Sequence, residues 1–331
     1  MQARATTEMA RGTLAAQRFL VEKLSQGERV GQYQVERELG AMRTGVVYQV
    51  EHLVLPRRAV LKVVHARAPQ AHGVQLLREA CILEALKHPG VPAVFESGVL
   101  EDRRAWFTVE RVEGSTVAEV LAGGPMGAEE IAALVRDVAE ILTTAHRRGI
   151  FHCGLRPDRI TLTPSRRFPI CITDWSDART HDARSAHLPL AGTSHYAAPE
   201  LARGEAVDDR ADVYALGVIA YMALTGGRPF SSSNGIYVPM LERCPGAPRE
   251  LALLIDQMLA DNRFDRPTAA AIHADLVELV VDVVDVVELP AVAEPIRIRK
   301  PRWTPAITFK AMNVVEDDDG MPIEVVDGCT D

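Results

Sequence analysis

The sequence predicts an α+β protein that begins with a small sheet-rich part and continues as a larger, mainly helical part. Between Tyr33 and Gly114, short runs rich in β-branched residues alternate with glycine or charged turns, which is typical of antiparallel strands. After Gly114 most segments carry the spacing of apolar residues expected of helices. Strands that come first and helices that follow favour an α+β fold with two separate parts.

The individual elements follow from local patterns. We expect strands at YQVEREL (33–39), GVVYQVEHL (45–53), RAVLKVV (58–64), VPAVFESGVL (91–100) and RRAWFTVERV (103–112). Helical periodicity predicts helices over residues 8–25, 72–87, 128–148, 209–225, 250–259 and 268–281. The helix over 209–225 is almost entirely apolar, so we expect it to be buried on every side.

Composition narrows the class of protein. The chain has 331 residues, of which 47% are hydrophobic and 25% charged, as in soluble globular proteins. Its net charge of -8 argues against binding to nucleic acid or to a membrane surface. The 5 cysteines never form a Cys-x-x-Cys pair, which favours reduced thiols in a cytoplasmic protein over a disulfide framework or a zinc site. We find no secretory signal, and the most apolar stretch, 213–224, is too short to span a membrane.

We divide the chain into three regions. Residues 1–32 are predicted to be a helical N-terminal extension, residues 33–283 the main domain, and residues 284–331 a linker or docking tail. Within the main domain, residues 33–113 form the small part and residues 114–283 the larger one. The tail holds a basic patch, an acidic run and several prolines, which discourage regular structure.

Seven motifs follow one another along the main domain. They are LGAMRTGVVY (39–48), AVLK (59–62), GIFHCGLRPDRI (149–160), TDWSDA (173–178), AGTSHYAAPE (191–200), ADVYALG (211–217) and DNRFDRPTAA (261–270). In this order they resemble the motifs of the bacterial eukaryotic-type (Hanks-type) Ser/Thr protein kinases, over roughly residues 33–281. The resemblance implies a bilobal protein-kinase-like fold with an antiparallel-sheet N-lobe and a mainly helical C-lobe.

The resemblance also implies a nucleotide site in the N-lobe. Its candidate residues are Gly40, Met42, Gly45, Val47, Val60, Lys62, Glu79 and Glu110. Lys62 corresponds to the lysine that binds the α/β-phosphates, and Glu79 to its partner on the following helix. Met42 replaces the middle glycine of the phosphate-binding loop, which should weaken the cradle. Without the neighbouring motifs, these residues would be an ordinary hairpin turn and a surface Lys–Glu pair.

The catalytic loop departs most from the family pattern. His152, Leu155, Pro157 and Ile160 match it, but the proton-accepting aspartate is Gly154, the lysine two residues later is Arg156, and the metal-binding asparagine is Arg159. A positioned base contributes about 10² to 10⁴ in rate, and glycine has no side chain to supply one. Asp158 is the nearest substitute in the sequence, but it lies elsewhere on the loop. We therefore expect no intact catalytic set.

One metal ligand and the architectural residues remain. Asp174 keeps the metal-binding carboxylate, and we hypothesise that it pairs with Arg159, so that an internal cation stands in for magnesium. Trp175 should still pack as an apolar plug. The resemblance implies structural roles for His152, Glu200, Asp212 and Arg266, with Glu200 paired to Arg266 and Asp212 anchoring the catalytic loop.

Three functions fit these observations. The first is a pseudokinase that binds protein partners as a scaffold or allosteric regulator, among them an active kinase or another signalling protein. The second is a Ser/Thr kinase with residual or atypical activity, and the third a nucleotide-sensing switch without turnover. ATP would bind weakly and without metal, and the role of magnesium stays open. Radiolabelled-ATP incorporation that depends on Lys62 distinguishes the second function from the others.

The sequence also offers candidate contact and regulatory segments. The N-terminal helix and residues 276–289 are candidate interaction surfaces, although the valines of the latter fit equally well as a cap on the large lobe. Ser185, Thr193 and Ser194 are candidates for phosphorylation or ordinary loop residues. Between Phe230 and Glu250 the segment is short, so we expect a reduced substrate-docking helix.

Overall fold

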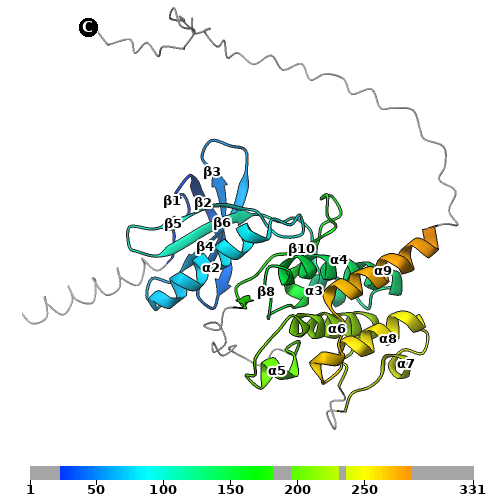
Figure 1. The fold of residues 1–331 in the computed structure, drawn as a ribbon. Helices are drawn as coiled ribbons and strands as arrows, with labels where there is room; N and C mark the ends of the chain where they lie inside the picture. The colour runs from blue at the N-terminus through cyan, green and yellow to red at the C-terminus, as the bar shows by residue number, and fades with distance from the viewer. Residues whose placement is uncertain (1–22, 182–194, 231–235, 285–331) are drawn as a thin grey trace, which may run out of the picture. The chain divides into compact units, whose positions relative to one another are not determined.

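The N-lobe is built on a six-stranded antiparallel sheet. The protein is described from a computed structural model, which covers residues 23–181, 195–230 and 236–284. The sheet has the order β1-β2-β3-β4-β6-β5. Its strands are β1 (Arg29–Val30), β2 (Tyr33–Met42), β3 (Gly45–His52), β4 (Arg58–Val64), β5 (Val94–Val99) and β6 (Ala105–Glu110). Helix α2 (Gln70–Leu86) packs against β4, β5 and β6, as Figure 1 shows in cyan.

The register of the sheet positions the first site residues. Strands β2 and β3 form a hairpin in which Met42 pairs with Gly45. In the next pair, Val47 of β3 lies opposite Lys62 of β4. Because directly opposed residues point to the same face of a sheet, Val47 and Lys62 face the same side. The bounds of these strands and of α2 agree with the prediction from the sequence to within a few residues.

The segment before β2 belongs to the N-lobe. Val30 pairs with Tyr33, and Leu24 is buried with its backbone N–H donating to Tyr48 Oη at 2.9 Å. The predicted N-terminal extension of residues 1–32 therefore overlaps the lobe at residues 23–32. Residues 23–25 are the last of the helix predicted over 8–25, but they are not helical. Leu24 packs instead into the hydrophobic core of the N-lobe sheet. The rest of that helix lies outside the described residues.

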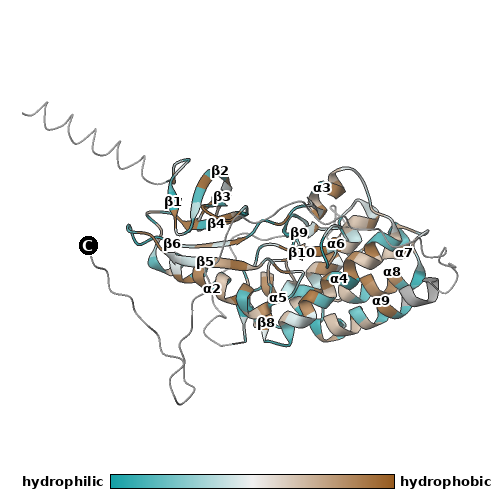
Figure 2. Ribbon diagram, turned by 90° about the horizontal axis from the view of Figure 1, so that it is seen from above, coloured by the Kyte–Doolittle hydropathy of each residue, from teal (hydrophilic) through white to brown (hydrophobic). Residues whose placement is uncertain are grey.

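The C-lobe is mainly helical. Its helices are α3 (Val117–Ala122), α4 (Ala128–His146), α5 (Pro199–Ala202), α6 (Arg210–Thr225), α7 (Met240–Arg243), α8 (Arg249–Met258) and α9 (Ala269–Val284). Helix α6 packs against α4 and α8, and α4 also packs against α9. From Ala211 to Tyr221 every residue of α6 is buried, as its apolar sequence predicts. By contrast, polar and apolar residues alternate around α4, α8 and α9 (Figure 2), which is typical of helices with one face toward a core.

Short elements hold the loops of the C-lobe. Strands β7 (Ser115–Thr116), β9 (Ile160–Leu162) and β10 (Ile170–Ile172) form one small sheet, and β8 (Ile150–Phe151) pairs with β11 (Arg179–Thr180). The 3₁₀ turns η1 (Pro157–Arg159) and η3 (Arg263–Asp265) complete the set. Since η1 and β9 follow β8 closely, the GIFHCGLRPDRI motif becomes a loop fixed at both ends.

Several predictions fall on or near undescribed residues. Ser185, Thr193, Ser194 and the tail from residue 285 lie outside the described part of the chain. Helix α9 continues to Val284, so residues 276–284 of the candidate surface 276–289 are helical. The short α7, with 4 residues, is the only helix described between Phe230 and Pro248, which agrees with the expected reduction. Among the described helices, none combines the length and apolarity that crossing a membrane requires.

Candidate functional site

A cavity of about 420 Å³ lies against the inner side of the N-lobe sheet. Its lining includes seven of the residues predicted to bind nucleotide or metal: Met42, Val47, Val60, Lys62, Glu79, Glu110 and Asp174. Apolar side chains from β3, β4 and β6 form one wall, and charged side chains gather at the other end. A cavity of this kind, apolar with a few convergent polar groups, is typical of a small-molecule site.

Lys62 is the centre of the charged end. Its Nζ donates to Glu79 Oε1 at 2.6 Å and lies 3.5 Å from Asp174 Oδ1. Burial alone would lower the pKa of Lys62, but the two carboxylates outweigh burial and the pKa is raised. The lysine is therefore charged at neutral pH and joins β4, α2 and the TDWSDA segment, which confirms the predicted Lys62–Glu79 pair.

The two predicted glycines are not part of the cavity lining. A Cβ at Gly45 would collide with the carbonyl oxygen of Val63 on the neighbouring strand, so this glycine is needed for the packing of β3 on β4. A Cβ at Gly40 would meet nothing within 4 Å. Met42, by contrast, lines the nucleotide cavity and a second cavity beside it. The hairpin therefore places a side chain where the family pattern has a glycine.

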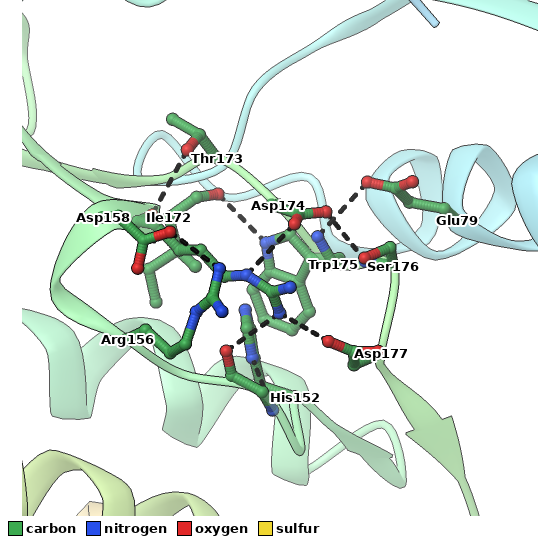
Figure 3. Close-up of polar contacts among 12 residues, drawn as sticks. Glu79, His152, Arg156, Asp158, Ile172, Thr173, Asp174, Trp175, Ser176 and Asp177 are labelled. Atoms are coloured by element: carbon green, nitrogen blue, oxygen red, sulfur yellow. Dashed lines mark hydrogen bonds and ion pairs between the residues drawn. The ribbon is translucent and has the colours of Figure 1, made fainter. Parts of the chain in front are cut away.

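Arg159 forms the second cluster of charges. Its Nε lies 3.1 Å from Asp174 Oδ2, and its Nη1 donates to Asp177 Oδ2 at 2.8 Å and to the carbonyl oxygen of Gly154 at 2.9 Å. Figure 3 draws the polar contacts around Asp174 and Asp177. Burial would lower the pKa of Arg159, but Asp174 and Asp177 raise it. The ion pair between Arg159 and Asp174 predicted from the sequence is present.

Gly154 and Arg159 share one space. A Cβ built on Gly154 would collide with Arg159 Nη1 and would lie 2.7 Å from Asp177 Oδ2. The guanidinium and the Asp177 carboxylate thus fill the space beside the missing side chain. Sequence reasoning missed Asp177. Its position three residues after Asp174 in the sequence could have indicated that it lies near the site, but only the fold brings it beside Gly154.

Asp174 is held as a carboxylate. Burial would raise its pKa, yet Lys62 and Arg159 outweigh burial, and the pKa lies below its usual range. The backbone N–H of Ser176 also donates to Asp174 Oδ1 at 3.1 Å. All of these partners are protein groups, so both oxygens of Asp174 are already engaged.

The loop carrying Gly154 is anchored from below by Asp212. Its carboxylate accepts from the backbone N–H of His152 at 2.8 Å and of Cys153 at 2.7 Å, and it lies 2.9 Å from His146 Nε2. Cys153 has a φ of 56°, a backbone conformation that residues other than glycine rarely adopt. The hydrogen bonds to Asp212 hold it in place. Asp212 therefore has the anchoring role predicted for it.

His152 is fully buried beneath the loop. Its Nδ1 accepts from the backbone N–H of Gly154 at 3.2 Å, and its ring lies 4.7 Å from that of Trp175. Burial lowers the pKa of His152 to about 4, so the ring is neutral at physiological pH. Trp175, which is 1% exposed, packs as the apolar plug that the sequence predicts.

Asp158 does not replace the missing base. It is exposed, and its Oδ2 accepts from Arg156 Nη2 at 2.7 Å, a pair labelled in Figure 3. Arg156 Nε is buried and has no hydrogen-bond partner among the described residues. The expectation that Asp158 lies elsewhere on the loop is therefore confirmed.

The predicted pair of architectural residues is fully formed. Arg266 donates to both oxygens of Glu200, at 2.7 and 3.0 Å, with its side chain completely buried. Further bonds run from Arg266 to the carbonyl oxygens of Ala260 and Asp261. This network ties α5 to the segment before α9.

The site keeps one of the two metal-binding positions of the family pattern. The cavity and Lys62 fit a nucleotide with its phosphates, but the position of the second metal ligand holds the cation Arg159. At about 4 Å two like charges repel by roughly 4 kcal/mol at an effective dielectric of 20. In the part of the chain that is described, no three His, Cys, Asp or Glu residues are grouped to hold a metal. Asp174 therefore remains as a metal-binding position of the family pattern, and position 159 carries a cation in place of the second ligand.

Comparison with known proteins identifies the family. The sequence profile of the protein kinase domain matches residues 33–276. Serine/threonine-protein kinase pkn2 of Myxococcus xanthus is 31% identical over 74% of this chain and 32% of its own length. Serine/threonine-protein kinase PknB of Mycobacterium leprae is 30% identical over 75% of this chain and 43% of its own length. The chain thus spans about a third to a half of the length of these relatives.

The solved structures agree. The crystal structure of the Mycobacterium tuberculosis PknI kinase domain has a TM-score of 0.62 at 27% identity, over 77% of this chain and 99% of that domain. A mutant of the same domain gives a TM-score of 0.61. The bilobal α+β fold predicted from the sequence is thereby confirmed, and the chain belongs to the protein kinase family.

Proposed function

We propose that this chain is a pseudokinase: a protein kinase domain that has lost phosphoryl transfer and acts in signalling by binding. The observation that carries the proposal is the guanidinium of Arg159, which fills the space beside Gly154 and contacts both Asp174 and Asp177. No side chain at position 154 accepts a proton, and position 159, where the family pattern has a metal-binding asparagine, carries a cation. Phosphoryl transfer depends on positioning and charge stabilisation, and both are removed together.

The retained scaffold supports a binding role. Lys62 and Glu79 are paired at 2.6 Å, and Asp212, Glu200 and Arg266 hold the C-lobe as the family pattern requires. ATP would enter the 420 Å³ cavity with its phosphates near Lys62. Because Arg159 already supplies positive charge to Asp174, we expect ATP to bind weakly and without magnesium. The occupied cleft would then affect the affinity for a protein partner.

Thermal denaturation with ATP tests this proposal. The purified chain should be stabilised by ATP in the presence of EDTA, and magnesium should add nothing to the shift in Tm. The Lys62→Ala variant should lose the shift. Stabilisation that requires magnesium would contradict the role assigned to Arg159. An absence of any shift with ATP would leave a scaffold that does not sense nucleotide.

Asp177 favours a second candidate function, a kinase with atypical residual activity. Its Oδ2 lies 2.7 Å from the position that a Cβ of residue 154 would occupy, so a carboxylate is present close to the place of the missing base. Its ion pair with Arg159 at 2.8 Å opposes such a role, since the pair holds the oxygen that a substrate hydroxyl would need. Transfer of radiolabelled phosphate that is lost in both Lys62→Ala and Asp177→Asn would establish this function.

A further inference from the structure

A second cavity of about 610 Å³ is lined by Gly154 and its neighbours in the catalytic-loop motif. Four arginines contribute to its lining: Arg43, Arg156, Arg159 and Arg203. They come from the β2–β3 hairpin, from the loop before η1, from η1 itself and from the residue after α5. Among the described residues, the acidic members of the lining are Asp174 and Asp177.

The charges of this cavity do not cancel. Asp174 and Asp177 are both engaged by Arg159. Arg43 is exposed and has no ion pair with any described residue. Within the described part of the chain, the ion pair of Arg203 is a 3.5 Å contact with Asp261, in which both side chains are mostly exposed. The cavity therefore keeps positive charge from Arg43 and Arg203, beyond what its own carboxylates neutralise.

Arg156 adds an accessible guanidinium. Its Nη2 is paired with the exposed Asp158, but its Nε is buried without a hydrogen-bond partner among the described residues. The Nε itself is out of reach of a ligand, but the Arg156 side chain is 39% exposed, so the rest of its guanidinium is accessible. The guanidinium group matches the oxygens of a phosphate through two parallel hydrogen bonds.

The substitution at position 154 changes which ligand the cavity accepts. An aspartate there would repel a phosphate, while Gly154 carries no charge. The remaining lining includes the apolar or small side chains of Leu155, Ala198, Leu201 and Ala215, so the cavity has room for a peptide beside the charged group. A phosphate on a peptide side chain accepts hydrogen bonds from the arginines and fills this space. An unmodified hydroxyl carries no charge for the arginines and leaves the space unfilled.

We propose that this arginine-lined cavity binds a phosphorylated serine or threonine of a partner protein. The inference rests on the proposed loss of catalysis, because an active site would release such a product. A kinase-like domain that cannot add the phosphate would thus recognise proteins on which another kinase has placed it. Binding to this cavity does not require ATP, since Lys62 is not among its lining residues.

Fluorescence anisotropy tests this proposal on the full chain. The probes are short labelled peptides with one phosphoserine or phosphothreonine among glycines and alanines, and the same peptides without phosphate. We expect the phosphorylated forms to bind at least about tenfold more tightly, the gain that one charge-assisted hydrogen bond supplies. Arg156→Ala, and the double variant Arg43→Ala/Arg203→Ala, should each lose about tenfold. Equal binding of both peptide forms would overturn the proposal.

Controls separate the other outcomes. Arg249→Ala removes an exposed arginine at the start of α8, outside the cavity, and should leave peptide binding unchanged. If Arg156→Ala fails to fold, the double variant of two exposed arginines carries the test. Inorganic phosphate that displaces the peptide at the peptide's own Kd would mean a site for the free ion only, and would overturn the proposal.

Two measurements keep this inference distinct from the proposed function. Lys62→Ala should lose ATP-dependent stabilisation and keep phosphopeptide binding. If that variant loses peptide binding as well, the cavity does not act independently and the inference fails. Radiolabelled phosphate transfer by the wild-type chain would instead refute the loss of catalysis, whatever the peptides do.

Discussion

Gly154 and Arg159 depend on each other, because the guanidinium of one occupies the space that a side chain on the other would need. The two substitutions are therefore one structural change. Restoring an aspartate at position 154 alone would force Arg159 and Asp177 to move. An aspartate at position 154 would therefore need a smaller side chain at position 159.

This dependence gives the first prediction. Gly154→Ala should lower the free energy of unfolding by about 1–3 kcal/mol, the usual cost of overpacking. Adding Arg159→Asn to the same chain should recover part of the loss, because the collision with the guanidinium disappears while the close contact with Asp177 remains. Gly40→Ala is the matched control, since its Cβ would meet nothing within 4 Å. Urea denaturation measures all of these variants, and a neutral Gly154→Ala would show that the space is not shared.

The second prediction concerns the charge of Arg159. Arg159→Asn removes the cation from Asp174 and restores an amide at the metal position, so magnesium should now tighten ATP binding. The repulsion of roughly 4 kcal/mol at about 4 Å sets an upper limit, and we expect at least a tenfold effect. Isothermal titration with ATP, with magnesium or with EDTA, measures it. Arg249→Ala serves as a control, because Arg249 is exposed at the start of α8 and lines neither cavity.

At the scale of elements, the sequence predicts the regular parts of the fold well. The helix α6 and the strands β2, β3 and β4 carry strong local patterns, and the structure agrees with them. Short elements such as β7 and β11 were not predicted, because pairs of two residues are set by tertiary contacts rather than by local pattern. The same reason explains why Asp177 was missed, since β11 and Arg159 bring it into the site.

The catalytic-loop element carries the third prediction, a pH dependence. Burial lowers the pKa of His152 to about 4, so between pH 6.5 and 4 the unfolded chain binds a proton that the folded chain does not. The free energy of unfolding should therefore fall as the pH falls through this window, by about 2–3 kcal/mol between pH 7.5 and 4.5 from this residue alone.

His152→Phe provides the comparison for this effect. The substitution keeps an aromatic ring against Trp175 but removes the titrating nitrogen, so urea denaturation at each pH should give a shallower slope. His88, whose pKa is also lowered by burial, remains in both proteins and cancels in the difference. Identical slopes in the two proteins would mean that His152 is not held neutral.

At the scale of the whole molecule, the residues that stabilise the fold and those of the catalytic loop differ in how well they follow the family pattern. The catalytic positions 154 and 159 are replaced, whereas the buried groups that hold the C-lobe follow the family pattern. The sequence could predict this division because each architectural residue lies in a recognisable motif. It could not predict the arginine-lined cavity, because Arg43, Arg156 and Arg203 are far apart in the chain and meet only in the folded protein.

The fourth prediction follows from that division. Arg266→Ala leaves Glu200 buried without its partner and should lower the free energy of unfolding by about 3–5 kcal/mol. Removing both charges with Arg266→Met/Glu200→Leu should recover part of this loss, but not all of it, because Arg266 also donates to the carbonyl oxygens of Ala260 and Asp261. Arg159→Asn should cost much less, since Arg159 lines the arginine-lined cavity rather than the core of the lobe. Urea denaturation followed by circular dichroism ranks the three variants, and a larger loss for Arg159→Asn than for Arg266→Ala would mean that the substituted site, and not the retained scaffold, holds this protein together.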